Sequence, residues 1–258
     1  MIEQYKHILW DWNGTLLDDS WLCVEVLNDL LKEQGRDQIS LETYRNHFDF
    51  PVIHFYEFLG FATDPDNFEA ISHQFIAAYE SRWLKECRLH AGVHQIFQDS
   101  QALGVSHSIL SAAHQTALEI GTAHFKIQGY FERLLGTDNI YAEGKVHRAK
   151  QWIQQCPWKA EEILLIGDTL HDFEVAQSIG IPCLLLGAGH CHRDRLESTQ
   201  SQVLDSLSDL WERLPKSSSP SSLGTWAPKS LLGFSDLPIG FRMNSHLAIE
   251  KDSGNRKK

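Results

Sequence analysis

The sequence lacks the features of a secreted or membrane-spanning protein. Its five cysteines are odd in number and form no CxxC pair, which favours a reducing compartment over a disulfide framework. The N-terminus has only Lys6 ahead of one short apolar run, unlike a signal peptide. No stretch approaches the roughly 18 uninterrupted apolar residues that a transmembrane helix needs. We therefore expect a soluble, cytoplasmic protein without a membrane partner.

Positive charge is also scarce. The 258 residues include 23 Lys and Arg against 34 Asp and Glu, a formal net charge of −11. The phosphates of DNA and RNA repel a chain this acidic, so we expect no nucleic-acid partner. The exception is the C-terminal stretch, where residues 216–258 hold seven basic and three acidic residues. Because its start is rich in Ser and Pro and it lacks periodicity, residues 215–258 are predicted to be a disordered tail.

Four short apolar runs, each followed by Gly, Asp or Ser, are predicted to be β-strands. They are residues 7–10, 105–110, 162–167 and 183–187. Helical patterns lie between them, and strands that alternate with helices form parallel sheets through right-handed crossovers. The helices of such a protein bury both faces of its sheet. We therefore predict an α/β fold with a Rossmann-like parallel sheet covered by helices.

Residues 18–88 interrupt this alternation. Helical patterns at 21–35 and 67–84 have no strong strand pattern between them. This predicts a helical cap inserted after the first strand. The predicted domains are a core of residues 1–17 and 89–214, the cap of residues 18–88, and the tail.

Polar or charged residues follow several of the predicted strands. Asp11 and Ser111 each follow one strand, Asp168 and Asp172 follow another, and Lys145 opens a predicted helix. In a parallel α/β sheet, ligands gather at the carboxyl ends of the strands. A single Asp after a strand is usually a helix cap or a turn residue. Together and in this order, however, these residues form a specific pattern.

The pattern resembles the haloacid dehalogenase-like hydrolase superfamily, whose motifs are DxDGT, a strand-end Ser or Thr, a Lys, and GDxxxD. The matching stretches here are "DWNGT" at 11–15, Ser111, Lys145 in "EGKVHRAK", and "GDTLHD" at 167–172. The similarity covers residues 5–210. The predicted cap is similar to that of the phosphoglycolate phosphatase-like branch.

The resemblance implies a Mg²⁺-dependent phosphatase that acts on a small phosphorylated metabolite. Asp11 would be the nucleophile and would form an aspartyl-phosphate. Mg²⁺ prefers oxygen ligands, and Asp11, Asp168 and the backbone carbonyl of Asn13 would hold it. Asp172 would reach the metal through water or orient Lys145.

The resemblance places the substrate phosphate at the same edge of the sheet. Ser111, Ala112 and Lys145 would bind phosphate oxygens, and Lys145 would also offset the charge of the carboxylates. Gly14, Thr15 and the amides of their turn would complete the phosphate cradle. Both a monomer and a homodimer are compatible with this reading.

Asn13 departs from the pattern, because phosphatases of this family usually carry a second Asp there as general acid and base. Asn cannot transfer that proton, and general acid–base help is typically worth about 10²–10⁴-fold. Three interpretations stay open: substrates with good leaving groups, a substitute histidine, or a slow or catalytically silent binding protein. The candidate histidines are His47, His54 and His171.

Other relatives also lack the second Asp. Dehalogenases lack the GDxxxD metal site, which is intact here, and this argues against dehalogenation. Phosphonoacetaldehyde hydrolases keep the metal site but need a cap lysine for a Schiff base, and Lys32 and Lys85 are the candidates. The "GHCH" stretch at 189–192 suggests zinc, but with no partner pair elsewhere it is predicted to be a loop.

Overall fold

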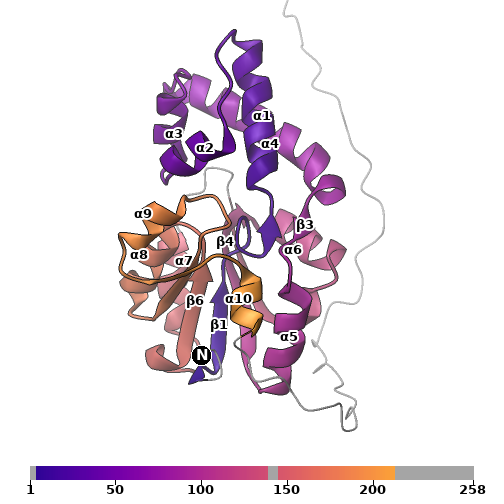
Figure 1. Ribbon diagram of the computed structural model, residues 1–258, viewed down its shortest axis with the longest axis vertical. Helices are drawn as coiled ribbons and strands as arrows, with labels where there is room; N and C mark the ends of the chain where they lie inside the picture. The colour runs from indigo at the N-terminus through magenta and orange to yellow at the C-terminus, as the bar shows by residue number, and fades with distance from the viewer. Residues whose placement is uncertain (1–3, 139–144, 213–258) are drawn as a thin grey trace, which may run out of the picture. The chain divides into compact units, whose positions relative to one another are not determined.

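The computed structural model describes residues 4–138 and 145–212, so the predicted tail lies outside the described residues. A six-stranded sheet has the strand order β5-β4-β1-β6-β7-β8, and all of its strand pairs are parallel (Figure 1). The strands are β1 (His7–Trp10), β4 (Ser106–His114), β5 (Phe131–Thr137), β6 (Ile163–Gly167), β7 (Cys183–Leu186) and β8 (Gln202–Leu204). This sheet and its helices confirm the predicted α/β fold.

β1 lies in the middle of the sheet, between β4 and β6. Trp10 pairs with Ile109 of β4 and with Ile166 of β6. Asp11 follows directly, and its backbone N–H donates a 2.9 Å hydrogen bond to the carbonyl of Ile166. Side chains that follow β1 and β6 therefore meet at one edge of the sheet, the edge where ligands bind in this class of fold.

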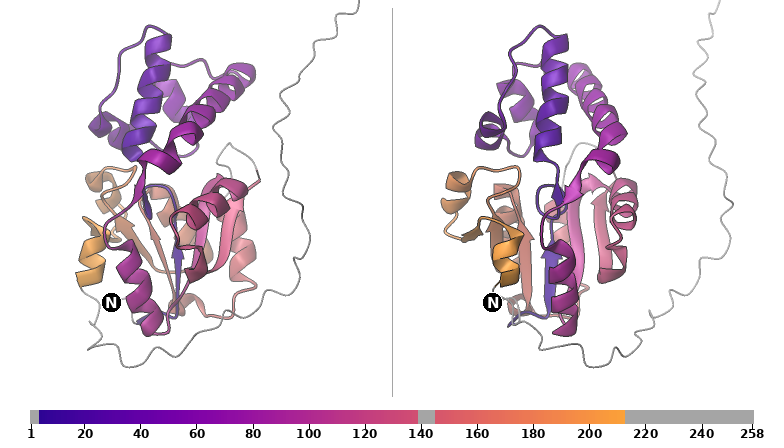
Figure 2. Two further views of the ribbon diagram at one scale, coloured as in Figure 1. Left: turned by 90° about the vertical axis from the view of Figure 1, so that its right-hand side faces the viewer. Right: turned by 45° about the vertical axis from the view of Figure 1, so that its right-hand side comes forward.

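Helices cover both faces of the sheet (Figure 2). They are α5 (Val93–Ala102), α6 (Gln115–His124), α7 (Lys145–Ile153), α8 (Leu170–Ile179), α9 (Arg193–Glu197) and α10 (Leu207–Glu212). Leu9 of β1 packs with α7 and α8 on one face, whereas Ile8 and Trp10 pack with α5 and α10 on the other. Successive strand residues point to opposite faces, so a strand covered on both sides is apolar throughout.

Four further helices form the region between β2 and β3, which we call the cap. They are α1 (Ser20–Glu33), α2 (Leu41–His47), α3 (Val52–Phe58) and α4 (Pro65–Glu86). β2 (Leu17–Asp18) pairs antiparallel with β3 (Arg88–Leu89), so the chain enters and leaves the cap side by side. This confirms a helical region after the first strand, whereas the exact boundaries of core and cap stay a prediction. None of the described helices combines the length and apolar character of a membrane span.

Several elements were not predicted. α2 and α3 have seven residues each, about two turns, which is too short for an apolar period to stand out. Their ends are set locally, as at the start of α2, where Ser40 accepts a hydrogen bond from the Thr43 N–H. β5 and β8 were also missed. The prediction that the second strand ends at residue 110 was wrong, because β4 continues to His114 and includes Ser111.

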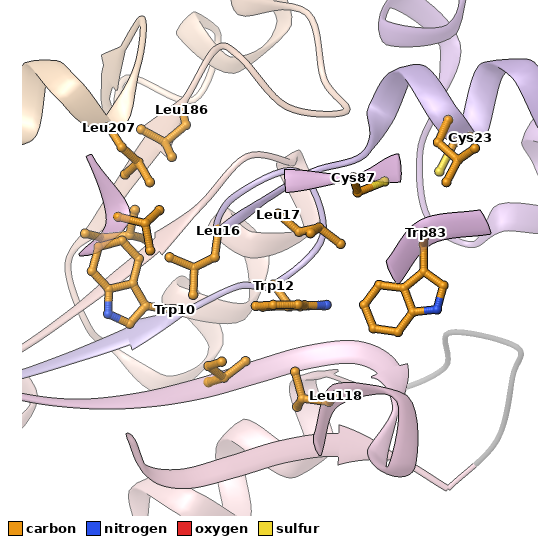
Figure 3. Packing of buried hydrophobic residues seen from close by; sticks show 14 of the residues in the cluster. Trp10, Trp12, Leu16, Leu17, Cys23, Trp83, Cys87, Leu118, Leu186 and Leu207 are labelled. Atoms are coloured by element: carbon orange, nitrogen blue, oxygen red, sulfur yellow. The ribbon is translucent and has the colours of Figure 1, made fainter. Parts of the chain in front are cut away.

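Tryptophans join the base of the cap to the core. Figure 3 shows Trp12, which follows the central strand, next to Leu118 of α6, with Trp83 from the end of α4 beside it. Both indoles pack on Gly121 of α6, where a Cβ atom would lie 2.6 Å from Trp83 and 2.9 Å from Trp12. Any larger residue at this position would push the indoles away. The close contact therefore holds the end of α4 against the core.

Candidate active site

Lys145 joins two carboxylates at the carboxyl edge of the sheet. α7 begins at this residue, as predicted, and its side chain is only 3% exposed. Its Nζ donates hydrogen bonds to Asp11 Oδ1 and, at 2.8 Å, to Asp172 Oδ1. Burial alone would lower the pKa of Lys145, but the charges of Asp11 and Asp172 raise it above its ordinary value. The ammonium group therefore stays protonated and offsets part of the negative charge around it.

Asp168 and Asp172 are held by the start of α8 and by two loops. Asp172 Oδ2 accepts hydrogen bonds from the backbone N–H groups of Asp168 (3.2 Å) and Thr169 (3.0 Å). Asp168 Oδ1 accepts one from the Thr15 hydroxyl at 2.6 Å, and its Oδ2 accepts one from the His190 N–H at 2.6 Å. The Thr15 hydroxyl thus orients Asp168, and a place for Thr15 in the phosphate cradle stays a prediction.

Gly14 lets the turn after the central strand pack directly against Asp168. Its φ of +75° lies in the left-handed region that favours glycine. A Cβ atom here would overlap the Asp168 carboxylate and the His190 ring. Substitution of Gly14 would therefore displace both groups.

Asp11, Asp168 and Asp172 form a buried cluster that could hold a metal ion. One carboxylate oxygen from each lies within 4.8 Å of the others. Burial raises the pKa of Asp11, Lys145 opposes this rise, and Asp172 adds to it. Burial also raises the pKa of Asp168. A set of oxygen donors whose charge is costly to bury suits a hard divalent cation.

Asp19, which belongs to none of the predicted motifs, holds several groups of the site in place. Its Oδ2 accepts hydrogen bonds from the Asn13 amide at 2.7 Å and the Tyr79 hydroxyl at 2.6 Å. Its Oδ1 accepts one from the Gly14 N–H at 2.8 Å and lies 3.2 Å from His190 Nε2. Burial alone would raise the pKa of Asp19, but His190, Tyr79 and Asn13 together hold it below its ordinary value. Asp19 is therefore an ionised carboxylate that has no contact with solvent.

His190 connects Asp19 to the cap. Its Nδ1 lies 2.8 Å from the hydroxyl of Tyr44 in α2. Burial alone would lower the pKa of His190, but Asp19 raises it to about 8. The ring is therefore largely cationic at neutral pH and donates from both nitrogens. Arg45 of α2 donates to two backbone carbonyls of the loop that carries His190, at 2.6 and 2.7 Å.

A cavity of about 220 Å³ adjoins these groups. The predicted site residues among its lining are Asp11, Asn13, Ser111, Ala112 and Lys145. Most of its remaining wall consists of aromatic and aliphatic side chains from the cap. The structure thus gathers five of the predicted site residues around one cavity, with the other carboxylates of the metal cluster packed beside it.

The other candidates from the sequence lie elsewhere. His47 and His54 are exposed on the cap, and His171 contacts Glu174 at 3.4 Å. Lys32 and Lys85 are exposed near the ends of α1 and α4. None of these five candidate residues is among the described residues that line the cavity.

The "GHCH" stretch forms the loop between β7 and α9, as predicted. His192 accepts a hydrogen bond from the Asp194 N–H at the start of α9, whereas His190 faces Asp19. The two histidines therefore have separate roles. Asp19 and His190 were missed as a pair because neither belongs to the four motifs, and at 171 positions apart no short stretch of the chain shows their contact. The one available signal was that His190, like Asp11 and Asp168, follows shortly after a buried strand.

Comparisons with known proteins match most of the chain. The family model for haloacid dehalogenase-like hydrolases matches residues 8–186. The chain is 24% identical over 191 residues to a phosphoglycolate phosphatase of Rhodobacter capsulatus, covering 71% of this chain and 84% of the relative. It is 25% identical over 202 residues to a 5′-nucleotidase of Pseudomonas aeruginosa, covering 76% and 89%. A solved haloacid dehalogenase-like family hydrolase from Streptococcus pneumoniae shares the fold with a TM-score of 0.69 at 18% identity, covering 81% and 98%.

Proposed function

The chain belongs to the haloacid dehalogenase-like hydrolase family, and we propose that it is a Mg²⁺-dependent phosphatase of a small phosphorylated metabolite. The reaction passes through an aspartyl-phosphate on Asp11. The observation that carries this proposal is the setting of Asp11. It is a buried carboxylate at the end of the central strand, paired with Lys145, beside two more carboxylates and at the edge of a cavity.

The charges of the site support a divalent cation. Four buried carboxylates surround two buried basic groups: Asp11, Asp19, Asp168 and Asp172 against Lys145 and His190. With all six groups ionised, the site has a net charge of −2, which one Mg²⁺ ion would balance. We propose that Asp11, Asp168 and the backbone carbonyl of Asn13 hold the ion, and that Asp172 contacts it through water. A bound Mg²⁺ would neutralise charge on the phosphoryl oxygens.

In the first step, a carboxylate oxygen of Asp11 attacks phosphorus. The bond from phosphorus to the leaving group breaks, and the leaving oxygen keeps the electron pair. That oxygen takes its proton from water, because Asn13 has no acidic proton to give. Lys145, Ser111 and the Ala112 N–H bind the oxygens of the phosphoryl group during the transfer.

In the second step, water attacks the phosphorus of the aspartyl-phosphate. The bond from phosphorus to Asp11 breaks, the carboxylate is restored, and inorganic phosphate leaves with the oxygen of that water. Solvent takes up the proton that the attacking water loses, which balances the proton that the leaving group took in the first step. Asn13 cannot act as the base that activates the water, so this step is expected to limit turnover. With a fast-reacting ester, the enzyme should therefore release a burst of alcohol before steady state.

Phosphate release from a panel of esters, anhydrides and acyl phosphates, with Mg²⁺ present, tests the proposal. Asp11→Asn should abolish turnover, whereas Asp66→Asn, at an exposed position in the first turn of α4, should leave it unchanged. Acid quenching should trap a phosphoryl group on the wild type but not on Asp11→Asn. Full phosphate release by Asp11→Asn would refute the mechanism, and tight binding of beryllofluoride without any turnover would instead favour a phosphate-binding role.

A further inference from the structure

We propose that the substrate of this site is the phosphate ester of an uncharged aromatic alcohol, whose ring occupies the cap end of the cavity. The inference rests on the proposed phosphatase function and specifies its leaving group. Two independent features lead to it. One is the wall of the cavity, and the other is the chemistry of Asn13.

Aromatic rings build the cap end of the cavity. Phe75, Tyr79 and Trp83 line it from successive turns of α4. Their rings are nearly parallel, with centroids 6.1 and 6.2 Å apart and interplanar angles of 14° and 13°. Phe48 and Phe55 also line it and meet edge to face at 5.6 Å. Ligand rings pack on such surfaces in offset-stacked or edge-to-face arrangements.

This ring wall adjoins the reacting end of the cavity. The Tyr79 hydroxyl accepts a 3.0 Å hydrogen bond from the Asn13 amide, and Asn13 is two residues beyond Asp11. Both Asn13 and Tyr79 line the cavity together with Asp11. A leaving group bound to phosphorus at Asp11 therefore extends past Asn13 onto the rings of α4.

Among the described residues, the lining of the cavity offers no free Lys or Arg side chain to a charged leaving group. Among the described lining residues, Lys145 provides the only Lys or Arg side chain, and it already holds two carboxylates. His190 is paired with Asp19, and Glu80 adds negative charge to the wall. His114 is the other basic lining residue, and it is exposed at the end of β4. A carboxylate or second phosphate bound among the rings would lose its water without gaining a partner.

The tyrosines of the wall add no charge to the cavity. Burial raises the pKa of all three above the ordinary value, so each stays a neutral phenol: Tyr44, Tyr56 and Tyr79. The wall is therefore uncharged over most of its surface, which favours an uncharged ring.

Asn13 favours the same class of leaving group for a different reason. A phenol loses its proton near pH ~10, whereas water, which a simple alcohol resembles, does so near ~15.7. A phenoxide therefore departs with much less help from an acid than an alkoxide does. General acid catalysis is typically worth about 10²–10⁴-fold, and an aryl ester can react without most of it.

Binding of non-hydrolysable phosphonates tests the cavity without requiring turnover. In calorimetric titrations with Mg²⁺, phenylphosphonate should bind at least tenfold tighter than methylphosphonate. Phosphonoacetate, which carries a carboxylate, should bind no tighter than methylphosphonate. Equal affinities for the phenyl and methyl compounds, or tightest binding of phosphonoacetate, would overturn the assignment.

Variants of Phe75 connect the preference to this wall. Phe75→Leu keeps an apolar surface without the ring and should lower the phenyl-to-methyl affinity ratio at least threefold. Phe75→Arg adds a cation and should raise the affinity for phosphonoacetate, relative to phenylphosphonate, at least tenfold. Phe58→Ala is the matched control, since its ring is 49% exposed and does not line the cavity, and it should keep the wild-type ratios. Unchanged ratios in both Phe75 variants would refute the proposal.

Turnover separates this inference from the proposed function. Phenyl phosphate and 4-carboxyphenyl phosphate have similar leaving groups but differ in charge, and kcat/KM should favour phenyl phosphate at least tenfold. Equal kcat/KM values for the two would leave the phosphatase intact and overturn the aromatic preference. No hydrolysis of any ester, with the phenylphosphonate preference retained, would refute the phosphatase and support the ligand class.

Discussion

The side-chain amide of Asn13 donates a 2.7 Å hydrogen bond to Asp19 Oδ2. An amide beside an ionised carboxylate is a matched donor and acceptor pair. A carboxylate at residue 13 would instead face a second carboxylate across the same distance. The residue that departs from the family pattern is therefore matched by a partner six positions further along the chain.

Asn13→Asp alone should destabilise the protein. The two carboxylates would repel each other, and the hydrogen bond from the amide to a charged group, worth about 1.5–3 kcal/mol, would be lost. We expect the free energy of unfolding, measured by denaturant titration, to fall by about 2 kcal/mol or more. Adding Asp19→Asn exchanges donor and acceptor and should recover at least half of the loss. A single variant as stable as the wild type would contradict this reading.

The exchanged pair should also change the chemistry. Asn13→Asp combined with Asp19→Asn carries a carboxylate where the family usually has its general acid and base. Turnover of alkyl phosphates should rise at least tenfold, within the general-acid range, while the phosphorylation step of aryl phosphates changes much less. Burst kinetics on an aryl phosphate separate phosphorylation from breakdown of the phosphoenzyme. No gain on alkyl esters would show that residue 13 does not limit the rate.

Lys145→Met should be among the more destabilising changes in the core. It leaves two buried carboxylates without their cation, and removing one partner of a buried ion pair typically costs about 3–5 kcal/mol. Denaturant titrations at pH 7.5 with EDTA measure the loss. Lys150→Met, at an exposed position on the same helix, is the control and should change stability by less than about 0.5 kcal/mol. Similar stabilities for the two variants would mean that Lys145 is not charged in the folded protein.

The sequence predicted the parts of the site that lie close to strand ends. β1 and β6 are buried at every residue, so they appear as unbroken apolar runs, and Asp11 and Asp168 follow them directly. Lys145 was predicted to open a helix in the stretch "EGKVHRAK", and α7 begins at this residue. Each of these features is set by a few neighbouring residues, and a sequence motif is such a short run of residues.

The remaining parts depend on contacts between distant segments. Asp19 meets His190 only because the loop after β7 folds back beneath α2, where Arg45 holds two of its carbonyls. The apolar period of residues 67–84 predicted the helix α4. It could not show that Phe75 and Tyr79 line a cavity instead of packing fully into the core. Which apolar face meets a ligand is decided by the packing of the cap.

Mg²⁺ should stabilise the protein through Asp168. A ligand that binds only the folded state adds about 2.7 kcal/mol at 100 times its Kd, so the melting temperature should rise with Mg²⁺ and fall again with EDTA. Asp168→Asn should lose most of this rise, whereas Asp194→Asn, at an exposed position on α9, should keep it. An unchanged rise in Asp168→Asn would assign the metal to the other cluster among the described residues, Asp19, Cys23 and His190. In that case Cys23→Ser should abolish the rise.

Acid should destabilise the fold through His107 of β4. Its Nδ1 accepts a 3.1 Å hydrogen bond from Trp10 Nε1, and its Nε2 lies 2.8 Å from the Ser100 hydroxyl. Burial lowers the pKa of His107 from 6.5 to about 3, because the charged ring would lose its water. The unfolded chain takes up this proton near pH 6.5, whereas the folded protein does so only near pH 3. The neutral His107 side chain therefore contributes its full stabilisation above pH 6.5. This stabilisation is lost as the pH falls from 6.5 to about 3.

Between pH 7.5 and 5, this one side chain should cost about 2 kcal/mol of unfolding free energy. His107→Gln retains an acceptor for Trp10 and a donor for Ser100 but cannot bind the proton. Its stability should therefore fall about 2 kcal/mol less than that of the wild type over the same range, whatever its starting value. His94→Gln, at an exposed position on α5, should keep the wild-type pH dependence. Stability depends on pH only through groups that bind protons unequally in the folded and unfolded states. Identical pH dependence of stability in His107→Gln and the wild type would therefore mean that the folded protein accepts a proton on His107.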